Sequence, residues 1–381
     1  MQDFDVLIIG GGVAGASAGY FLAQANADLR IGLIEAENQP GYHTSGRSAA
    51  ILIPGYGGSS VAPFTRASRH FFDSSPDAFC DHPLISPRGS LHIARADQAD
   101  GMAQCRAELD AQGAEYENID PARIGEFCPL IRPGYAVDAL YDANCFDLDV
   151  SAIHQGFLRG LTASGGEIIT KTCLIAAKHN GNHWKVVTTG GSMSAGILLN
   201  AAGAWGDEVA QMAGVEPLGL KPLRRTIIVT PSVEKLDRDM PVVVDAVEDF
   251  YFRVEGDGVL ASPGDATPSP PCDAQPEEED VATIAWRLQQ ATTLPVKTIS
   301  NKWAGLRTFS PDDVPAIGFA PDADGFFWCV GQGGFGIQTA PAIGAMSAAL
   351  ITGGDLPSWV KDARAVPETL DPARFSIPLR H

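Results

Sequence analysis

Residues 4–35 read FDVLIIGGGVAGASAGYFLAQANADLRIGLIE, and this stretch decides the fold. It opens with a short apolar strand pattern at 4–9, continues as a small-residue helix pattern, and ends in a second strand pattern, RIGLIE. The turn between the first strand and the helix carries Gly10, Gly12 and Gly15 in the spacing G-x-G-x-x-G. In a βαβ unit such glycines permit a tight turn, close approach of a pyrophosphate, and close packing of helix on strand.

The second strand ends at an acidic residue, which supports the same interpretation. A pyrophosphate would lie at the helix N-terminus, where free amides and the helix dipole favour an anion. Glu35 follows at the position where a carboxylate accepts hydrogen bonds from both ribose hydroxyls and disfavours a 2′-phosphate. Together these features predict a Rossmann-like dinucleotide-binding unit.

Composition argues against several classes of function. The 381 residues include 27 basic and 46 acidic side chains, a formal net charge of −19, which argues against binding to nucleic acid or anionic membranes. The apolar runs are too short for a transmembrane helix, and Asp3 and Asp5 stand where a secretory signal would carry basic residues. The cysteines are odd in number and never spaced C-x-x-C. We therefore expect reduced thiols, no metal site and a cytoplasmic protein.

The chain after Glu35 favours FAD over NAD as the dinucleotide. Residues 43–52, HTSGRSAAIL, combine hydroxyls, a flexible glycine and small alanines that let a flat ring approach closely. Arg47 in this stretch would neutralise a phosphate, hold the loop, or only pair with a neighbouring helix. Two more glycine turns open helices, ILLNAAGAWGDEVA (197–210) with Gly203, and GQGGFGIQTAPAIG (331–344). If the dinucleotide is FAD, the N-terminus of the second of these helices faces the pyrimidine edge of the flavin ring, where negative charge develops on reduction.

The element patterns divide the chain into two interleaved domains. Strand and helix patterns alternate near both ends, the middle is rich in strand patterns, and 263–280 is a proline-rich acidic loop. The predicted fold class is α/β, with a discontinuous Rossmann-like FAD-binding domain interleaved with a mixed α+β substrate domain. The predicted limits are 1–80, 146–215 and 305–381 for the FAD-binding domain, and 81–145 and 216–304 for the substrate-binding domain. Helices are predicted at 66–78, 96–113, 147–164 and 281–291.

Long motifs carry a resemblance to a known family. They include QPGYHTSGRSAA (39–50), AFCDHPLISPR (78–88), AIHQGFLRG (152–160), WAGLRTF (303–309) and GFFWCVGQGGFGIQT (325–339). The chain resembles the D-amino-acid-oxidase-like FAD oxidoreductases, and within them the bacterial FAD-dependent D-arginine dehydrogenases. The resemblance implies noncovalent FAD, since the sequence lacks the covalent-attachment cysteine motif of sarcosine oxidases. The FAD contacts that it implies are Ala14, Glu35, Ala36, Thr44, Ser45, Gly46, Arg47, Ser48, Ala49, Ala50, Ile51, Leu174, Gly305, Gly333, Gly334, Phe335, Gly336, Ile337 and Gln338.

The resemblance also implies a site for an amino-acid substrate. An arginine is the natural clamp for a carboxylate, because its planar fork matches the two oxygens. Arg225 and Arg307 match the family's clamp, Tyr56 and Tyr251 match the tyrosines that complete it, and the carbonyl of Gly334 would position the amine. Tyr56 lies between glycines in IPGYGG, which resembles the family's gating loop.

Two positions depart from the pattern of the enzymes that prefer D-arginine. Ser90 stands where those proteins carry a glutamate for the guanidinium, and Ile51 stands where they carry a histidine near the substrate's amine. Glu248 or Asp249, close in sequence to Tyr251, would be an alternative acid. We therefore expect a preference for neutral or apolar D-amino acids.

The predicted activity is hydride transfer from Cα of a D-amino acid to flavin N5, followed by hydrolysis of the imino acid to keto acid and ammonia. No catalytic base is required. The alternative activity is oxidation of a secondary amine or N-methyl amino acid, of the glycine or sarcosine type. A second alternative is a flavin-bound assembly protein without turnover. The resemblance favours a dehydrogenase, with a quinone or respiratory carrier as electron acceptor.

Overall fold

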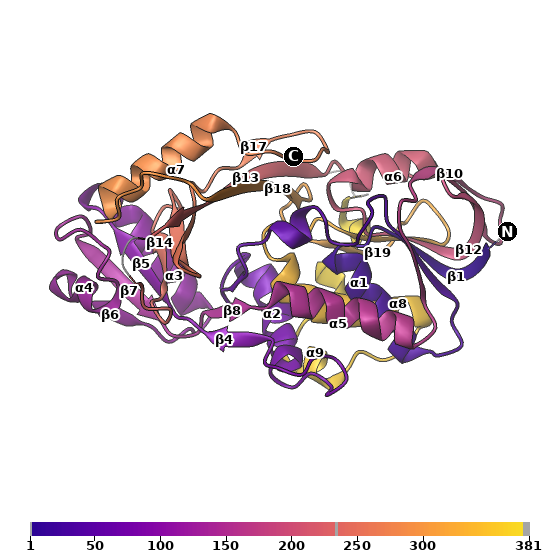
Figure 1. Ribbon diagram of the computed structural model, residues 1–381. Helices are drawn as coiled ribbons and strands as arrows, with labels where there is room; N and C mark the ends of the chain where they lie inside the picture. Colours follow the sequence, from indigo (N-terminus) through magenta and orange to yellow (C-terminus); the bar gives the residue numbers. More distant parts are fainter. Residues whose placement is uncertain (1, 233–234, 376–381) are drawn as a thin grey trace, which may run out of the picture.

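The computed structural model describes residues 2–232 and 235–375, which form two lobes, each built on one large sheet (Figure 1). An eight-stranded sheet lies in the lobe on the right of Figure 1, and a nine-stranded sheet lies in the lobe on the left. A small sheet of β3 (Ile51–Leu52), β8 (Phe146–Leu148) and β4 (Ile85–Pro87) lies between them.

The eight-stranded sheet has a parallel centre. The parallel strands run in the order β9–β2–β1–β12–β20, and β19 pairs antiparallel with β20. The first part of β12 also pairs with an antiparallel hairpin of β10 and β11. The bounds are β1 (Gln2–Ile9), β2 (Ile31–Ile34), β9 (Glu167–Ile169), β10 (Leu174–His179), β11 (Trp184–Thr188), β12 (Gly191–Asn200), β19 (Ala316–Phe319) and β20 (Phe326–Val330).

Helices cover both faces of this sheet, and alternate side chains of β1 point into one helix layer or the other. Ile8 is buried with Phe157 among the helices of one layer, whereas Leu7 packs with Val209 on the other side. The first layer holds α1 (Val13–Ala25), α5 (Val150–Ala163), α8 (Gly336–Thr352), α2 (Gly58–Asp73) and α9 (Ser358–Asp362), and the second holds α6 (Gly206–Ala213). A Cβ on Gly344 of α8 would meet the backbone of α1 at 2.8 Å, so α1 and α8 pack closely through small residues.

The nine-stranded sheet is mostly antiparallel and has one apolar face. The order is β17–β13–β16–β15–β14–β5–β7–β6, with β18 paired to β13. Val243, Phe252 and Ile228 form a core with Ile284 and other residues of α7 (Glu278–Ala291). The bounds are β5 (Ser90–Ala94), β6 (Glu117–Ile119), β7 (Asp138–Asp142), β13 (Lys221–Pro231), β14 (Val242–Asp245), β15 (Tyr251–Glu255), β16 (Gly258–Ser262), β17 (Thr267–Pro268) and β18 (Asn301–Phe309); α3 (Ala99–Ala111) and α4 (Ile124–Phe127) lie in the same lobe.

Several predicted elements are displaced in the structure. The helix predicted at 66–78 is α2, which begins at Gly58 after Gly57 (φ +94°) ends the preceding loop. In the strand-rich middle of the chain, β9 and β10 are separate strands, because Lys171 (φ +54°) breaks the extended chain between them. The predicted loop 263–280 contains the short strand β17, and α7 begins at Glu278. Strand β18 crosses the predicted domain limit at residue 305, and the limits stay a prediction.

None of the helices in residues 2–232 and 235–375 is long and apolar enough to cross a membrane. All seven cysteines are free thiols.

Candidate active site

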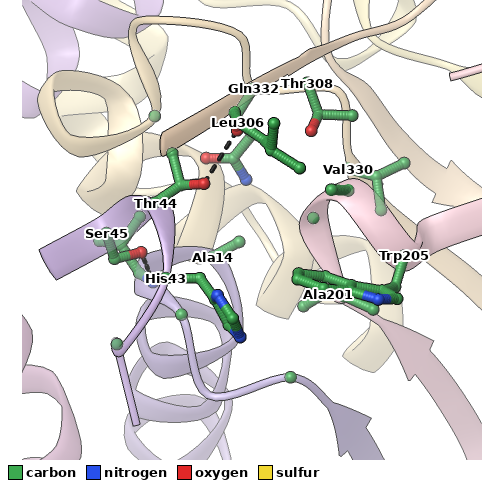
Figure 2. A pocket seen from close by; sticks show the side chains of 18 of the residues that line it. Ala14, His43, Thr44, Ser45, Ala201, Trp205, Leu306, Thr308, Val330 and Gln332 are labelled. Atoms are coloured by element: carbon green, nitrogen blue, oxygen red, sulfur yellow. Dashed lines mark hydrogen bonds between the residues drawn. The ribbon is translucent and has the colours of Figure 1, made fainter. Parts of the chain in front are cut away.

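A cavity of about 430 Å³ lies where the end of the parallel sheet meets strands β13 and β18. Its wall is formed by the turn after β1, the end of β2, the segment 41–49, the turn after β12, part of β18, and the turn before α8. Figure 2 shows Ala14, Thr44, Ala201, Leu306 and Gln332 around this space, with His43 and Trp205 at one side. The rings of His43 and Trp205 lie 4.7 Å apart, measured between centroids.

The glycines after β1 permit contacts that any side chain would block. Gly10 has φ +106°, and a Cβ there would lie 2.6 Å from the carbonyl oxygen of Ala201. A Cβ on Gly15 would lie 2.0 Å from the carbonyl oxygen of Gly10. Gly12, the residue before α1, lines the cavity together with Val13 and Ala14 of the first turn. The turn is therefore shaped for close approach of a phosphate to the backbone.

Glu35 lies beside this turn and is 9% exposed. Its Oε2 accepts a hydrogen bond from the Gly11 amide at 2.8 Å, and its Oε1 accepts one from the Glu37 amide at 2.9 Å. A carboxylate has about four lone-pair sites, so both oxygens can accept further bonds from a ribose. His154 supports the turn from α5, with Nε2 2.9 Å from the Gly11 carbonyl oxygen. Burial lowers the pKa of His154, which favours the neutral imidazole donating from Nε2.

The segment 44–47 forms a one-turn helix, η1 (Thr44–Arg47), that links both sheets. Ser45 Oγ accepts a hydrogen bond from the Val13 amide at 2.9 Å, and Thr44 Oγ1 donates to the Leu306 carbonyl at 2.8 Å (Figure 2). One side of the cavity wall is thereby attached to α1 and to β18.

The guanidinium of Arg47 is hydrogen-bonded to other protein groups. Its guanidinium donates to the carbonyls of Ala274 and Ala304, each at 2.9 Å, to the Tyr42 carbonyl at 3.3 Å, and to the Asp273 carboxylate. Of the roles considered for Arg47, these contacts favour holding its own loop, which they attach to the acidic loop 263–280 and to β18.

Ser48 and Ala49 still line the cavity, whereas Ala50 and Ile51 do not. Ala50 has φ +58°, and its amide donates to Ser48 Oγ at 3.0 Å. The carbonyl of Ala49 accepts a bond from Arg253 Nε at 3.1 Å, and Ile51 pairs with Asp147 in the small sheet.

The turn before α8 lines the cavity and also contacts the residues predicted to bind the substrate's carboxylate. A Cβ on Gly334 would lie 2.6 Å from the hydroxyl of Tyr56 and 3.2 Å from Cζ of Arg307. Arg307 Nη1 donates to the Tyr56 hydroxyl at 3.0 Å. The residues of this turn that line the cavity are Gly331, Gln332, Gly333, Gly334, Gly336 and Ile337. Phe335 is buried, and its ring lies 6.1 Å from that of Tyr56.

Sheet register places both arginines on the same face. Leu223 pairs with Arg307 and Arg225 pairs with Gly305, so Arg225 and Arg307 are diagonal neighbours on adjacent strands. Both line the cavity, and Arg225 Nε donates to the Asp265 carbonyl at 2.5 Å. Burial, followed by the charge of Arg307, lowers the pKa of Arg225. Burial also acts to lower the pKa of Arg307, but Tyr56, Tyr251 and nearby carboxylates outweigh it, and that pKa is raised.

Tyr251 faces the same side of the sheet, through its pairing with Ser262 on β16 and the pairing of β16 with β13. Its hydroxyl is buried, and no described residue provides it with a hydrogen-bond partner. A buried hydroxyl without a partner is unfavourable, so the position points to a ligand. The two arginines and two tyrosines of the prediction thus form one polar group beside Gly334, although neither tyrosine belongs to the cavity wall.

Ser90 is fully buried and does not line the cavity. Its Oγ lies 3.3 Å from His92 Nε2, and the other ring nitrogen of His92 lies 3.5 Å from Cys105 Sγ. Asp249 is held by Arg95 and Arg287 at 3.3 Å each. Glu248 is exposed on a turn, and its charge helps to raise the pKa of Arg307. Glu248 is therefore the better candidate for a second acid near the clamp.

Sequence reasoning missed several residues of the cavity wall. Trp205, His43, Leu306, Thr308 and Gln332 line it (Figure 2). Trp205, Leu306, Thr308 and Gln332 belong to quoted motifs, and His43 is part of HTSGRSAAIL, so position within a motif was the available signal. Leu174 and Gly203 lie in the wall as expected, whereas five other expected contacts do not: Gly46, Ala50, Ile51, Phe335 and Gln338.

A model of the family described as FAD dependent oxidoreductase matches residues 5–350. The chain belongs to this family. The protein is thus an FAD-dependent oxidoreductase, and the glycine turns, Glu35 and the helix ends around the cavity fit that cofactor. FAD supplies a ring that accepts a hydride when bound.

The curated relatives are about 25% identical to this chain over most of its length. Human mitochondrial dimethylglycine dehydrogenase is 25% identical over 376 residues, covering 93% of this chain and 43% of the relative. Sarcosine oxidase subunit beta from Rhizobium meliloti (strain 1021) is 24% identical and covers 92% of this chain and 85% of the relative. The chain thus spans less than half the length of the dimethylglycine dehydrogenase that it matches.

Solved structures confirm the fold class. Glycine oxidase from Geobacillus kaustophilus superposes with a TM-score of 0.82 at 19% identity, covering 93% of this chain and 96% of that one. L-proline dehydrogenase from P. horikoshii superposes with a TM-score of 0.81 at 21% identity, covering 98% of each chain. The predicted family is confirmed by the sequence match, whereas the finer likeness to D-arginine dehydrogenases stays a prediction.

Proposed function

We propose that the protein oxidises the carbon–nitrogen bond of a small amino acid, with N-methyl and other secondary amines of glycine as the preferred class. The observation that carries this proposal is the pair Arg225 and Arg307, which lie on one sheet face beside Tyr56 and Tyr251 and next to the turn at Gly334. Such a group suits a carboxylate, because two cations and two hydroxyls converge where the cavity ends. Relatives named for dimethylglycine, sarcosine and glycine support the substrate class.

In the proposed reaction the protein's side chains bind and orient the substrate. Arg225 and Arg307 hold the carboxylate, the Tyr251 hydroxyl gains the partner that it lacks, and the carbonyl of Gly334 accepts a hydrogen bond from the amine. The amine reacts in its neutral form. FAD, when bound, would accept a hydride from the carbon attached to the amine nitrogen, and the nitrogen lone pair would form the C=N bond. Water would then cleave the imine to an amine and a carbonyl compound.

We propose that Glu35, Ser45, Gly203 and the turn at 331–337 hold the FAD, without a covalent bond to the protein. Val13, the first residue of α1, has its amide already paired to Ser45. The electron acceptor that reoxidises the flavin remains, as the resemblance implies, a quinone or respiratory carrier. Comparison of reoxidation by oxygen with reoxidation by a soluble quinone tests that part.

Oxidation of neutral D-amino acids is the second candidate. The residue type at position 90 favours it over D-arginine oxidation, since a serine cannot pair with a guanidinium as an acid would; this serine is itself buried against His92 and does not line the cavity. Ile51 is paired with Asp147 in the small sheet and does not line the cavity. A substrate with an apolar side chain would use the same carboxylate clamp.

The deciding experiment is anaerobic reduction of the oxidised holoenzyme by a panel of amino acids, followed as loss of flavin absorbance. The panel holds sarcosine, dimethylglycine, glycine, D-leucine, D-methionine, D-arginine and L-leucine. We expect sarcosine, whose neutral secondary amine keeps one N–H for the Gly334 carbonyl, to reduce the flavin fastest. Faster reduction by D-leucine or D-methionine would establish the second candidate, and rapid reduction by D-arginine would show that another acid, such as Glu248, replaces the missing glutamate. No reduction by any of them would favour a flavin protein without this chemistry.

A further inference from the structure

We propose that the side chain of Gln338 is a positioning group that sets Tyr56 over Arg307. The inference rests on the proposed carboxylate clamp. Gln338 lies in the first turn of α8, is 2% exposed, and is absent from the cavity wall. Its side chain points to the loop that carries Tyr56.

The amide of Gln338 pairs with one residue in both directions. Oε1 accepts a hydrogen bond from the Ile53 amide at 3.2 Å, and Nε2 donates to the Ile53 carbonyl, also at 3.2 Å. Nε2 further approaches Thr65 Oγ1 at 3.0 Å and the Tyr56 carbonyl at 3.5 Å. The Gln338 amide thus bonds to the loop backbone as a neighbouring strand would. Its oxygen and nitrogen both have hydrogen-bond partners, as a buried amide requires.

The loop is a turn whose two ends meet Gln338. The Tyr56 amide donates to the Ile53 carbonyl at 3.1 Å, so Ile53 and Tyr56 close one turn. The Tyr56 hydroxyl then reaches Arg307 Nη1 at 3.0 Å. Since Gly334 of the cavity turn lies against both Tyr56 and Arg307, the start of α8 fixes the cavity wall and the clamp together.

The opposite side of the turn is held more weakly. Gln112, the residue after α3, donates from Nε2 to the Gly55 carbonyl at 3.3 Å and is partly exposed. Gln112 makes one hydrogen bond to the turn, whereas the more deeply buried Gln338 amide makes three. Motion of the turn would therefore break the Gln112 bond first and pivot on Gln338.

The test uses the holoenzyme and measures binding of a small carboxylate that cannot be oxidised. Acetate and benzoate are titrated against the oxidised protein, and the change in flavin absorbance gives each Kd. Gln338→Leu keeps the side chain's bulk and removes all of its hydrogen bonds. We expect the Kd of both probes, and the KM of any substrate found, to rise about tenfold with FAD content unchanged and the saturating rate of flavin reduction within about twofold.

Thr339→Val is the matched control, because Thr339 is fully buried on α8 and its Oγ1 donates only within the helix, to the Phe335 carbonyl at 2.9 Å. Thr65→Val is a smaller change to the same hydrogen-bond group, and it replaces Gln338→Leu as the test if that variant does not fold. It removes one partner of Gln338 Nε2, and we expect a smaller rise in Kd.

Arg307→Ala separates this inference from the proposed function. If Arg307→Ala abolishes carboxylate binding while Gln338→Leu and Thr65→Val match Thr339→Val, the clamp stands and the positioning role is overturned. If Arg307→Ala leaves carboxylate binding intact, the proposed function fails. Loss of FAD from the Gln338→Leu and Thr65→Val proteins, with carboxylate affinity retained, would assign Gln338 to the cofactor instead.

Discussion

Arg307 carries its charge at the place where both lobes meet, and its Nη1 already holds the Tyr56 hydroxyl. Replacing it with alanine removes the charge-assisted bonds to a bound carboxylate and leaves Tyr56 without that partner. We expect Arg307→Ala to raise the substrate KM about 100-fold, equivalent to about 3 kcal/mol, while FAD stays bound. Steady-state kinetics and the flavin-to-protein absorbance ratio check both parts.

The control is Lys302→Ala on the same strand, which removes an exposed cation paired with Glu278. An unchanged KM for Arg307→Ala would remove Arg307 from the clamp.

His92 links stability to pH. Burial lowers the pKa of His92 to about 4, whereas an unfolded imidazole titrates near pH ~6.5. As the pH falls from about 6.5 to about 4, the unfolded state takes up a proton that the folded state does not, so stability is lost over this window and is fully present above it. The loss is up to about 3 kcal/mol.

We expect His92→Asn to lose less of its free energy of unfolding between pH 7 and pH 4.5 than the wild type does. Urea unfolding at both values measures this difference. His70→Asn, which removes an exposed imidazole, is the control. Equal pH slopes for the wild type and His92→Asn would show that His92 takes up its proton equally in the folded and unfolded states.

The turn between β1 and α1 is the element whose glycines are most constrained. A Cβ on Gly15 would lie 2.0 Å from the Gly10 carbonyl oxygen, so alanine must push the helix away from the strand. We expect Gly15→Ala to lose about 1–3 kcal/mol of stability and most of its bound FAD. Thermal unfolding and released-flavin fluorescence measure the two effects.

Gly125→Ala is the comparison for that change, because a Cβ at this helical glycine of α4 meets nothing within 4 Å. We expect it to be neutral or slightly stabilising. Retention of FAD by Gly15→Ala at the wild-type level would contradict the close-approach explanation.

Local patterns decided which elements were predictable. The dinucleotide turn was found because its glycine spacing, the flanking strand patterns and Glu35 all lie within 32 residues of one another. Arg225, Arg307, Tyr56 and Tyr251 came from motif resemblance, and their meeting depends on sheet register that no local pattern reveals.

The side-chain roles of Gln338 and Arg47 were not accessible from sequence. Gln338 bonds to Ile53, 285 positions away, and Arg47 bonds to Asp273, 226 positions away. Composition and periodicity carry no information on such pairs. Short strands such as β3, β4 and β17 were missed for a related reason, because two or three residues do not establish a period.

At the scale of the whole molecule, the two lobes are joined around the cavity by contacts of η1. Thr44 bonds to β18, Ser45 bonds to α1, and Arg47 bonds to the loop 263–280 and to β18 through Ala304. The Trp303 indole also donates to the Arg47 carbonyl at 3.1 Å. A change at η1 should therefore alter both cofactor retention and the order of a distant loop.

Arg47→Lys tests this coupling, because lysine keeps the charge but cannot reach several acceptors at once. The variant would leave the carbonyls of Ala274 and Ala304 with fewer partners and release Asp273. We expect a loss of about 1–2 kcal/mol and faster proteolytic cleavage within 263–276, with weaker FAD retention. Arg123→Lys, in an exposed pair with Glu117 and Glu126, should change none of these. If the loop is cleaved faster while FAD affinity is unchanged, Arg47 holds the loop alone, and the cofactor wall is set by Thr44 and Ser45.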